Sequence, residues 1–320
     1  MSLTASLRRA LRRLWCADAP LTFVGVGMLV VLLPSLAGLA LDPRTITGAP
    51  AWLKPAKFAV SAGVYSLTLA WVVSWLPDWP RTRRVVSWTT AVVMVLEVAI
   101  IDLQAWRGMT SHFNVATPLD ATLFGVMGTG IAVQTAASAL VALALWKQPF
   151  VNRAFGLALR AGMVITLLGA ASGGLMTAPT SAQLAAVRST HTLATSGAHT
   201  VGAPDGGPGL PGTGWSRDHG DLRIPHFVGL HALQVLPLFA LLAARLRSTD
   251  AAARVTRVAT WSYGVFFALL LRQAWQGEGL LNPGTVTLAL FAFWTVASIA
   301  AGLVAARDWQ AAPRRHEVTA

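Results

Sequence analysis

Eight apolar runs constrain this chain more than any other feature of its sequence. A membrane-spanning α-helix needs about 20 predominantly apolar residues, and runs of that kind lie near residues 20–42, 56–77, 85–106, 119–146, 153–176, 225–246, 253–275 and 283–306. The first run follows several arginines, but its core is too long for the apolar region of a signal peptide, which covers about 7–15 residues. We therefore expect an all-α integral membrane protein with eight transmembrane helices.

The composition agrees with a membrane protein and excludes several other classes. Charged residues make up 12% of the 320 residues and hydrophobic residues 54%, whereas a soluble domain carries roughly 25% charged residues. The single cysteine, Cys16, excludes a disulfide framework, an iron–sulfur cluster on cysteine ligands and covalent haem attachment. The glycine motifs of ATP and NAD sites are missing, and the basic residues lack the soluble domain that nucleic-acid recognition needs.

The basic residues lie between the apolar runs and predict how the helices are oriented. With the N-terminus inside, the inner segments hold 16 lysines and arginines and the outer segments hold 8. Because the cytoplasmic side of a membrane protein carries the excess of positive charge, we expect both termini in the cytoplasm and the protein in a bacterial inner membrane. The basic segment 1–19 and the tail 307–320 are then cytoplasmic, and the long, turn-rich connection 177–224 lies outside.

Two pairs of stretches match at a constant offset of 169 residues. Leu103–Gly108 (LQAWRG) aligns with Arg272–Gly277 (RQAWQG), and Leu53–Phe58 (LKPAKF) aligns more weakly with Leu222–Phe227 (LRIPHF). A chance match of a few apolar-tolerant residues is one explanation. We favour a duplicated four-helix unit, with one half at 20–146 and the other at 147–306. An even number of spans in each unit makes the two halves parallel repeats.

Ionisable residues inside the apolar runs indicate a pathway, because a charged group at mid-membrane costs at least about 2.5–3.5 kcal/mol on insertion scales. Glu97 lies near the middle of the third run, and Gln104 and Arg107 follow it toward the outer end. We expect a proton or ion path, or an acid beside a cofactor; a structural carboxyl bonded to a neighbour such as Arg160 is the alternative. Other outer ends of runs add Lys54, Lys57, Arg272, Gln273, Gln276 and Glu278, and one cavity holding Glu97 and Glu278 would account for the lysines.

Four histidines near the outer ends of the runs are candidate ligands: His112, His199, His226 and His231. The five-residue spacing places His226 and His231 about 140° apart on a regular helix, which suits two separate ligands better than one shared metal. We expect a metal on His231, His226 and His112, or a haem bound by two or more of the four. Packing against another helix and binding a substrate are the alternatives. A bound imidazole needs an acceptor, for which Asp120, Asp221 or Gln234 would serve, and Asn114 lies beside His112.

The stretches SHFN at 111–114, GDLR at 220–223 and HFVGLHALQ at 226–234 resemble a family of uncharacterised multi-pass bacterial membrane proteins. The resemblance covers spans two to six and implies a multi-pass fold without an activity. The layout of eight spans in two four-helix halves, with histidines on the outer side, is also similar to that of haem A synthase. The paired glutamate and histidine helix motifs of that family have no match at corresponding positions, so the resemblance implies no haem ligands.

Three functions are compatible with the sequence. The first is a membrane oxidoreductase with haem b or a transition metal near the outer leaflet, in which Glu97 and Gln104 pass protons and Arg107 and Arg272 hold haem propionates or an anionic substrate. The second is a cofactor-free transporter or receptor for a small solute or ion, with Glu97 at its centre. The third is a membrane metallohydrolase, in which zinc activates water. The expected partners are the lipid bilayer and a small-molecule or ion substrate, and a homo-oligomer is left open.

Overall fold

The computed structural model describes residues 3–246 and 248–307 and is almost entirely helical. Its helices are α1 (Leu3–Ala17), α2 (Ala19–Leu41), α3 (Leu53–Val73), α4 (Pro80–Trp106), α5 (Pro118–Lys147), α6 (Arg153–Leu175), α7 (Ser181–Thr190), α8 (Arg223–Leu230), α9 (Ala232–Ala243), α10 (Thr249–Trp275) and α11 (Thr285–Ala306). Two antiparallel strand pairs join them, β1 (Thr45–Ile46) with β2 (Ala49–Pro50) and β3 (Thr200–Val201) with β4 (Gly220–Asp221). Residues 308–320 of the expected tail lie outside the described residues.

The long helices confirm an all-α, membrane-embedded protein. Within the described chain, six helices are long and apolar enough to cross a bilayer: α2, α3, α4, α5, α6 and α11. The bent pair of α8 and α9, which corresponds to the expected run 225–246, raises the number to seven if it is one span. The expected run 253–275 forms the 27-residue helix α10, which carries arginines near both ends and does not meet the same apolar test.

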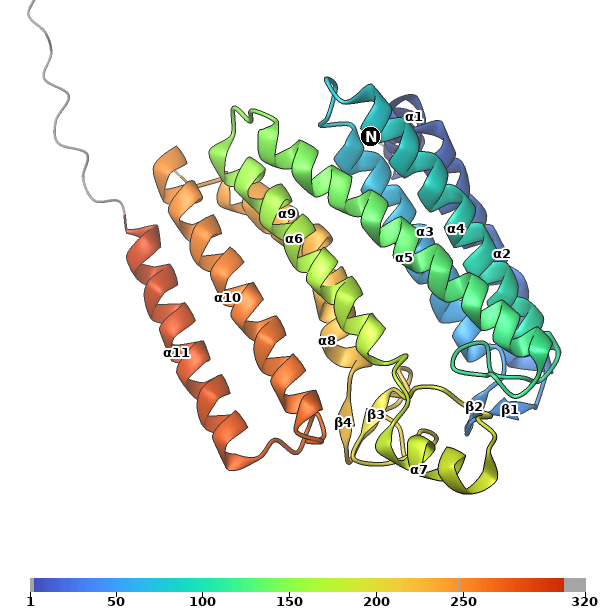
Figure 1. The fold of residues 1–320 in the computed structure, drawn as a ribbon. Helices are drawn as coiled ribbons and strands as arrows, with labels where there is room; N and C mark the ends of the chain where they lie inside the picture. The colour runs from blue at the N-terminus through green and yellow to red at the C-terminus, as the bar shows by residue number, and fades with distance from the viewer. Residues whose placement is uncertain (1–2, 247, 308–320) are drawn as a thin grey trace, which may run out of the picture.

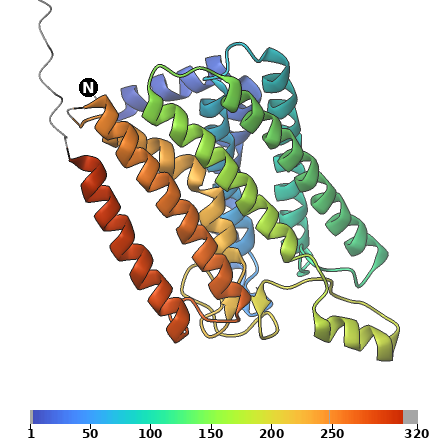
Figure 2. The ribbon, with the colours of Figure 1, turned by 60° about the vertical axis from the view of Figure 1, so that its left-hand side comes forward.

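The connecting segments sort to the two ends of the bundle (Figure 1). The β1–β2 pair, α7, the β3–β4 pair and the turn between α10 and α11 lie together at one end, which we call the loop end. The N-terminus and the end of α11 lie at the opposite end, which we call the N-terminal end. Figure 2, turned by 60°, shows the same separation. All the segments that the sequence places outside therefore share one end of the molecule.

Side-chain caps fix where several of the helices begin. Asp18 accepts a hydrogen bond from the backbone N–H of Leu21 and so caps α2. Thr117, Asn152 and Ser248 cap α5, α6 and α10 in the same way. A capping side chain satisfies one of the backbone donors that the first turn of a helix leaves free. The helix starts are thus encoded locally, and the capped α6 and α10 begin at the N-terminal end.

The helices pack in two similar groups. In the first group α3 lies against α2 and α4, and α4 lies against α5; in the second, α6 lies against α8, α9 and α10, and α10 lies against α11. The pair α5–α6 joins the groups. The largest apolar core crosses that boundary, because Leu69 of α3, Leu145 of α5, Leu159 of α6 and Leu233 of α9 are all fully buried in it. The two groups therefore form one body.

A close glycine contact brings α8 against α6. A Cβ atom added to Gly169 of α6 would lie 2.6 Å from the backbone of Gly229 on α8, and one added to Gly229 would lie 2.5 Å from Gly169. Small residues allow such an approach between helices in membranes. Two residues after Gly229 the helix breaks at His231, and α9 continues at an angle of 44° to α8. This geometry positions His226 of α8 against α6.

Candidate functional site

His112 links three segments at the loop end. It lies in the turn between α4 and α5, and its Nε2 is 3.4 Å from Oε1 of Glu97 on α4. On the other side of the ring, Nδ1 is 3.1 Å from Nζ of Lys54 on α3 and 3.2 Å from Oγ of Ser111. Burial lowers the pKa of His112 well below its ordinary value, and the nearby charges of Lys54, His199 and His226 lower it further. The imidazole is therefore neutral and bridges an amine and a carboxyl group.

Glu97 is a buried acid with one unused oxygen. Its side chain is only 5% exposed, and within the described chain Oε2 has no hydrogen-bond partner. An unpaired carboxyl group that is buried away from water is costly unless it is neutralised or has a function. The alternative partner Arg160 is not involved, because its guanidinium donates to the carbonyl oxygens of Leu145 and Gln148 at the opposite end.

The turn that carries His112 is held by the long loop 177–224. Phe113 has a positive φ of 65°, a conformation that non-glycine residues adopt rarely. Its buried ring packs against Met176, Leu222 and Ala274, and its carbonyl accepts from the N–H of Ser196 at 2.8 Å. Asn114 closes the turn by accepting from the N–H of Ala116 at 3.1 Å. The contacts with the second helix group therefore set the position of the His112 ring.

A second imidazole, that of His199, lies in the long loop beside Asp205. His199 Nδ1 is 2.7 Å from Oδ2 of Asp205, and the carboxylate also accepts from the N–H groups of His199 and Thr200. Burial lowers the pKa of His199, an effect that the Asp205 hydrogen bond partly opposes. For Asp205, burial alone would raise the pKa, but the hydrogen bonds from His199 and Thr200 hold it below its usual range. The ring of Phe113 lies 4.8 Å from that of His199, which connects this pair to the His112 turn.

The two histidines of the sixth expected span point to different neighbours. His226 Nδ1 is 2.7 Å from the carbonyl oxygen of Gly169, and a Cβ on Gly173 would meet the same ring at 2.7 Å. His231 lies at the break between α8 and α9, with its ring 4.2 Å from that of Phe227. The amide of Gln234 hydrogen-bonds the Thr68 hydroxyl at 3.2 Å, which joins α9 to α3. The two rings thus share no ligand position.

Three cations surround these groups. Lys54 interacts electrostatically with Glu97, Lys57, Arg223 and Asp205. Lys57 Nζ donates to the carbonyl oxygen of Thr213 at 2.8 Å. Arg223 forms an ion pair with the fully buried Asp221 at 2.6 Å and also donates to the carbonyl oxygen of Gly214. The segment 213–221 is thereby fastened over the first turns of α3 and α8.

The other polar residues at the loop end form separate helix-end clusters. Asp120 of α5 accepts from Gln104 at 2.9 Å and from Arg107 at 2.7 Å, and its second oxygen accepts from Thr117. Gln104 also donates to the carbonyl oxygen of Thr110, six residues later. The polar residues that were expected to form one pathway along α4 therefore have separate partners. Glu97 faces His112, whereas Gln104 and Arg107 connect α4 to α5. Asp120 serves this connection and is not an imidazole acceptor.

The end of α10 repeats this arrangement. Gln273 donates to the carbonyl oxygen of Gly279, also six residues later, at 2.8 Å, while Gln276 is the exposed residue that follows α10. Arg272 donates to Thr287, and Glu278 accepts from the N–H of Gly284. Hydrogen bonding to Thr287 lowers the pKa of Glu278. Glu278 is therefore engaged by its own turn and by α11, whereas Glu97 faces His112.

The expected three-histidine metal site does not form. Within the residues that the structure describes, no group of three or more histidine, cysteine, aspartate or glutamate side chains could hold a metal ion. His112 has both ring nitrogens occupied, His226 faces α6, and His231 faces Phe227. His191 and His219 are exposed, as expected for ordinary loop residues.

Two residues of the site escape the sequence argument, namely Asp205 and Arg223. The repeat offset points to Arg223, because it aligns with Lys54 just as His226 aligns with Lys57. Asp205 follows His199 in a loop rich in glycine and proline, where spacing carries no information about contacts.

Comparisons with protein-family models, curated proteins and solved structures found no match to this chain. The function is therefore inferred from the geometry of the loop end.

Proposed function

We propose that the protein is an eight-span inner-membrane transporter that moves a small anionic solute together with protons, without a cofactor. Glu97, His112 and Lys54 form its proton relay, and the amines of Lys54 and Lys57 attract the solute at the outer side. The observation that carries this proposal is the His112 ring, which contacts an amine on one edge and a buried carboxyl group on the other.

The contacts of His112 support proton transfer through its ring. A neutral imidazole accepts at one nitrogen and donates at the other. Transfer of a proton from the Lys54 ammonium to Nδ1, with transfer of the Nε2 proton to Glu97, leaves a neutral amine, a neutral imidazole and a protonated carboxyl group. The free oxygen Oε2 of Glu97 can pass a proton onward. Ionisable groups inside membranes commonly mark such relays.

The charge at the loop end supports an anionic solute. Asp221 neutralises Arg223, and Asp205 is engaged by His199. Neither Lys54 nor Lys57 forms an ion pair with any residue of the described chain. An unneutralised pair of amines beside a neutral imidazole favours a carboxylate or phosphate ligand.

The arrangement of the helices supports eight spans in two parallel halves. Counting α10 and the bent α8–α9 pair with the six apolar helices brings the number to eight. The repeated QAW stretches end α4 and α10 with the same turn, in which Gly108 and Gly277 have φ values of 72° and 75°. Transporters are often built from such repeats, with the binding site between them. The excess of basic residues at the N-terminal end favours that end as the cytoplasmic one.

Reconstitution into proteoliposomes tests the proposal. A pH-sensitive dye trapped inside reports proton movement when acetate, lactate, succinate or inorganic phosphate is added outside. We expect the wild type to respond to at least one of these anions and Glu97→Gln to lose the response. Asp102→Asn is the matched control, because Asp102 lies on the same helix with a partnerless oxygen of its own but outside the relay. Equal responses from Glu97→Gln and the wild type would contradict the proposal.

A second candidate, a haem- or metal-binding redox protein, is favoured by one observation. His199 and His226 each have Nδ1 hydrogen-bonded to an acceptor, Asp205 in one case and the Gly169 carbonyl in the other. This is how metal-ligating histidines are oriented, with Nε2 left for the metal. The two rings also interact electrostatically. A site on these two side chains would use His226 and His199 in place of His112 and His231.

An absorption spectrum and metal analysis of the purified protein separate the two candidates. A redox protein expressed in a host that supplies cofactors would carry a Soret band or stoichiometric iron, copper or zinc, lost in His226→Ala. A transporter without a cofactor would be colourless and free of metal. The metallohydrolase expected as a third function has no further observation in its favour.

A further inference from the structure

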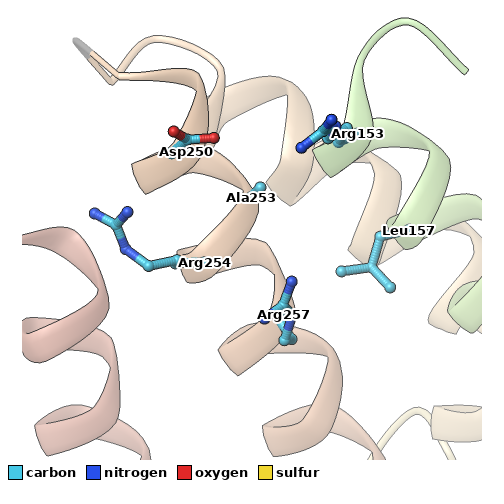
Figure 3. A pocket seen from close by; sticks show the side chains of 6 residues that line it. All are labelled: Arg153, Leu157, Asp250, Ala253, Arg254 and Arg257. Atoms are coloured by element: carbon cyan, nitrogen blue, oxygen red, sulfur yellow. The ribbon is translucent and has the colours of Figure 1, made fainter.

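A basic pocket lies at the N-terminal end of the bundle, far from the loop end. Its volume is about 370 Å³, and it is lined by Arg153 and Leu157 of α6 and by Asp250, Ala253, Arg254 and Arg257 of α10. Figure 3 shows the side chains of the two helices bordering one space. Three guanidinium groups and one carboxylate give this lining a net positive charge.

Two of the three arginines have no partner among the residues that the structure describes. Arg254 donates to the carbonyl oxygens of Ala305 at 3.2 Å and Arg307 at 3.1 Å, and so holds the end of α11. Arg153 and Arg257 make no hydrogen bond or ion pair with any described residue, and Asp250 forms no ion pair. Both α6 and α10 begin at this pocket, and the start of a helix carries a partial positive charge. The positive charge of the lining therefore exceeds that of its single carboxylate.

An apolar surface continues from the pocket along the same two helices. On α10, Trp261 and Val265 follow Arg257 at intervals of four residues and are 73% and 44% exposed. On α6, Val164 and Leu168 follow the pocket residue Leu157 and are 40% and 51% exposed. Residues at these spacings share a helix face. The charged lining of the pocket is thus followed by an exposed apolar surface, which we call the apolar track.

We propose that this pocket binds the phosphate group of an anionic phospholipid, with an acyl chain along the apolar track. A phosphate accepts hydrogen bonds from the forked guanidinium groups of Arg153 and Arg257. Basic pockets between membrane helices on the cytoplasmic side are suited to anionic headgroups. Because the apolar track continues from the charged lining, a phospholipid fits better than a free phosphate ion. This inference does not depend on the transport or redox proposal for the loop end.

Native mass spectrometry of the full chain in a neutral detergent tests the inference, with phosphatidylglycerol and phosphatidylcholine as probes. We expect tighter binding of phosphatidylglycerol, and a loss of about five-fold in affinity for each arginine removed, in Arg257→Gln and in the double variant Arg153→Gln/Arg257→Gln. Arg81→Gln is the matched control, because Arg81 is an exposed arginine at the same end, outside the pocket. The control is expected to bind lipid like the wild type.

Two outcomes would overturn the inference. One is equal affinity for phosphatidylglycerol in the wild type and the double variant; should the double variant fail to fold, Arg257→Gln alone decides the same question. The other is full displacement of the lipid by millimolar inorganic phosphate, which would identify a site for a soluble anion. Thermal midpoints without added lipid verify that each variant is folded.

Discussion

Lys54 and Lys57 stand on the first turns of α3 at the positions that Arg223 and His226 occupy on α8, 169 residues later. On α3, the Lys54 amine contacts the His112 ring and, through it, the buried Glu97. On α8, Arg223 is paired with a buried carboxylate next to it in the chain, Asp221. Positions 169 residues apart thus carry a cation beside titratable side chains in one helix group and a cation that fastens a loop in the other.

The interiors of the two halves differ more than their ends. The glutamines that close the final turns of α4 and α10 make the same contact six residues later. The position that aligns with Glu97, however, is Phe266, whose ring stacks on Trp294 with centroids 5.0 Å apart. Similar helix ends thus support interiors that differ, with an acid at this position in the first helix group and an aromatic ring in the second.

Replacing Arg223 or Lys54 is expected to give the largest difference in stability and activity between the two aligned positions. Arg223→Met leaves Asp221 buried without its partner, so we expect the free energy of unfolding to fall by about 3 kcal/mol. Lys54→Met removes a cation that forms no ion pair, so stability should change little while anion-driven proton movement is lost. Denaturation in detergent and the proteoliposome assay measure the two effects. Equal losses of stability would show that the two cations have the same role.

Replacing glycine by alanine at close helix contacts should also lower the stability by different amounts in the two helix groups. Alanine at Gly169 places a methyl group 2.6 Å from the Gly229 backbone, whereas alanine at Gly63 meets its nearest neighbours, in α2, at 3.2–3.3 Å. We expect Gly169→Ala to cost about 2–3 kcal/mol and Gly63→Ala under about 1 kcal/mol. Gly128→Ala is the control, because a Cβ there meets nothing within 4 Å. Comparable thermal midpoints for the first two variants would weaken the contrast between the halves.

The two glutamines test the similarity of the helix ends. Gln104 and Gln273 are buried amides that each donate to the carbonyl oxygen six residues later. Their replacement by alanine leaves buried acceptors without a donor, at a cost of about 1–2 kcal/mol each. Gln104→Ala should be slightly worse, because Asp120 also loses a donor. If only one of the two replacements lowered the stability, the ends of α4 and α10 would not be equivalent.

The last expected effect is a dependence of stability on pH that develops only below about pH 6.5. The pKa values of folded His112 and His199 lie below the ordinary value of 6.5. The unfolded chain therefore binds more protons below pH 6.5, and stability falls as the pH drops from 6.5 toward the folded pKa values. The slope is at most about 1.4 kcal/mol per pH unit for each histidine. Thermal midpoints at pH 7.5 and 5 measure it, and His112→Asn should flatten the profile while His219→Asn, at an exposed site, should not.

The sequence alone determines the helical elements and the side on which most candidate residues gather. Apolar runs and capping residues are local patterns, so the long helices and their starts could be predicted from them. Glu97 could be recognised as a buried acid because it lies in the middle of such a run. The repeat of the glutamine turns also follows from the sequence, through the match of Leu103–Gly108 with Arg272–Gly277.

The partners of these residues were decided by the tertiary structure. His112 and Lys54 are 58 positions apart, and His226 and Gly169 are 57 apart. No periodic pattern encodes such a pairing, because it depends on how closely α6 and α8 approach and on where the loop 177–224 folds back. The same packing turned His226 toward α6, His231 toward Phe227 and Glu278 toward α11, and so replaced the expected three-histidine metal site with a bridge between Lys54 and Glu97.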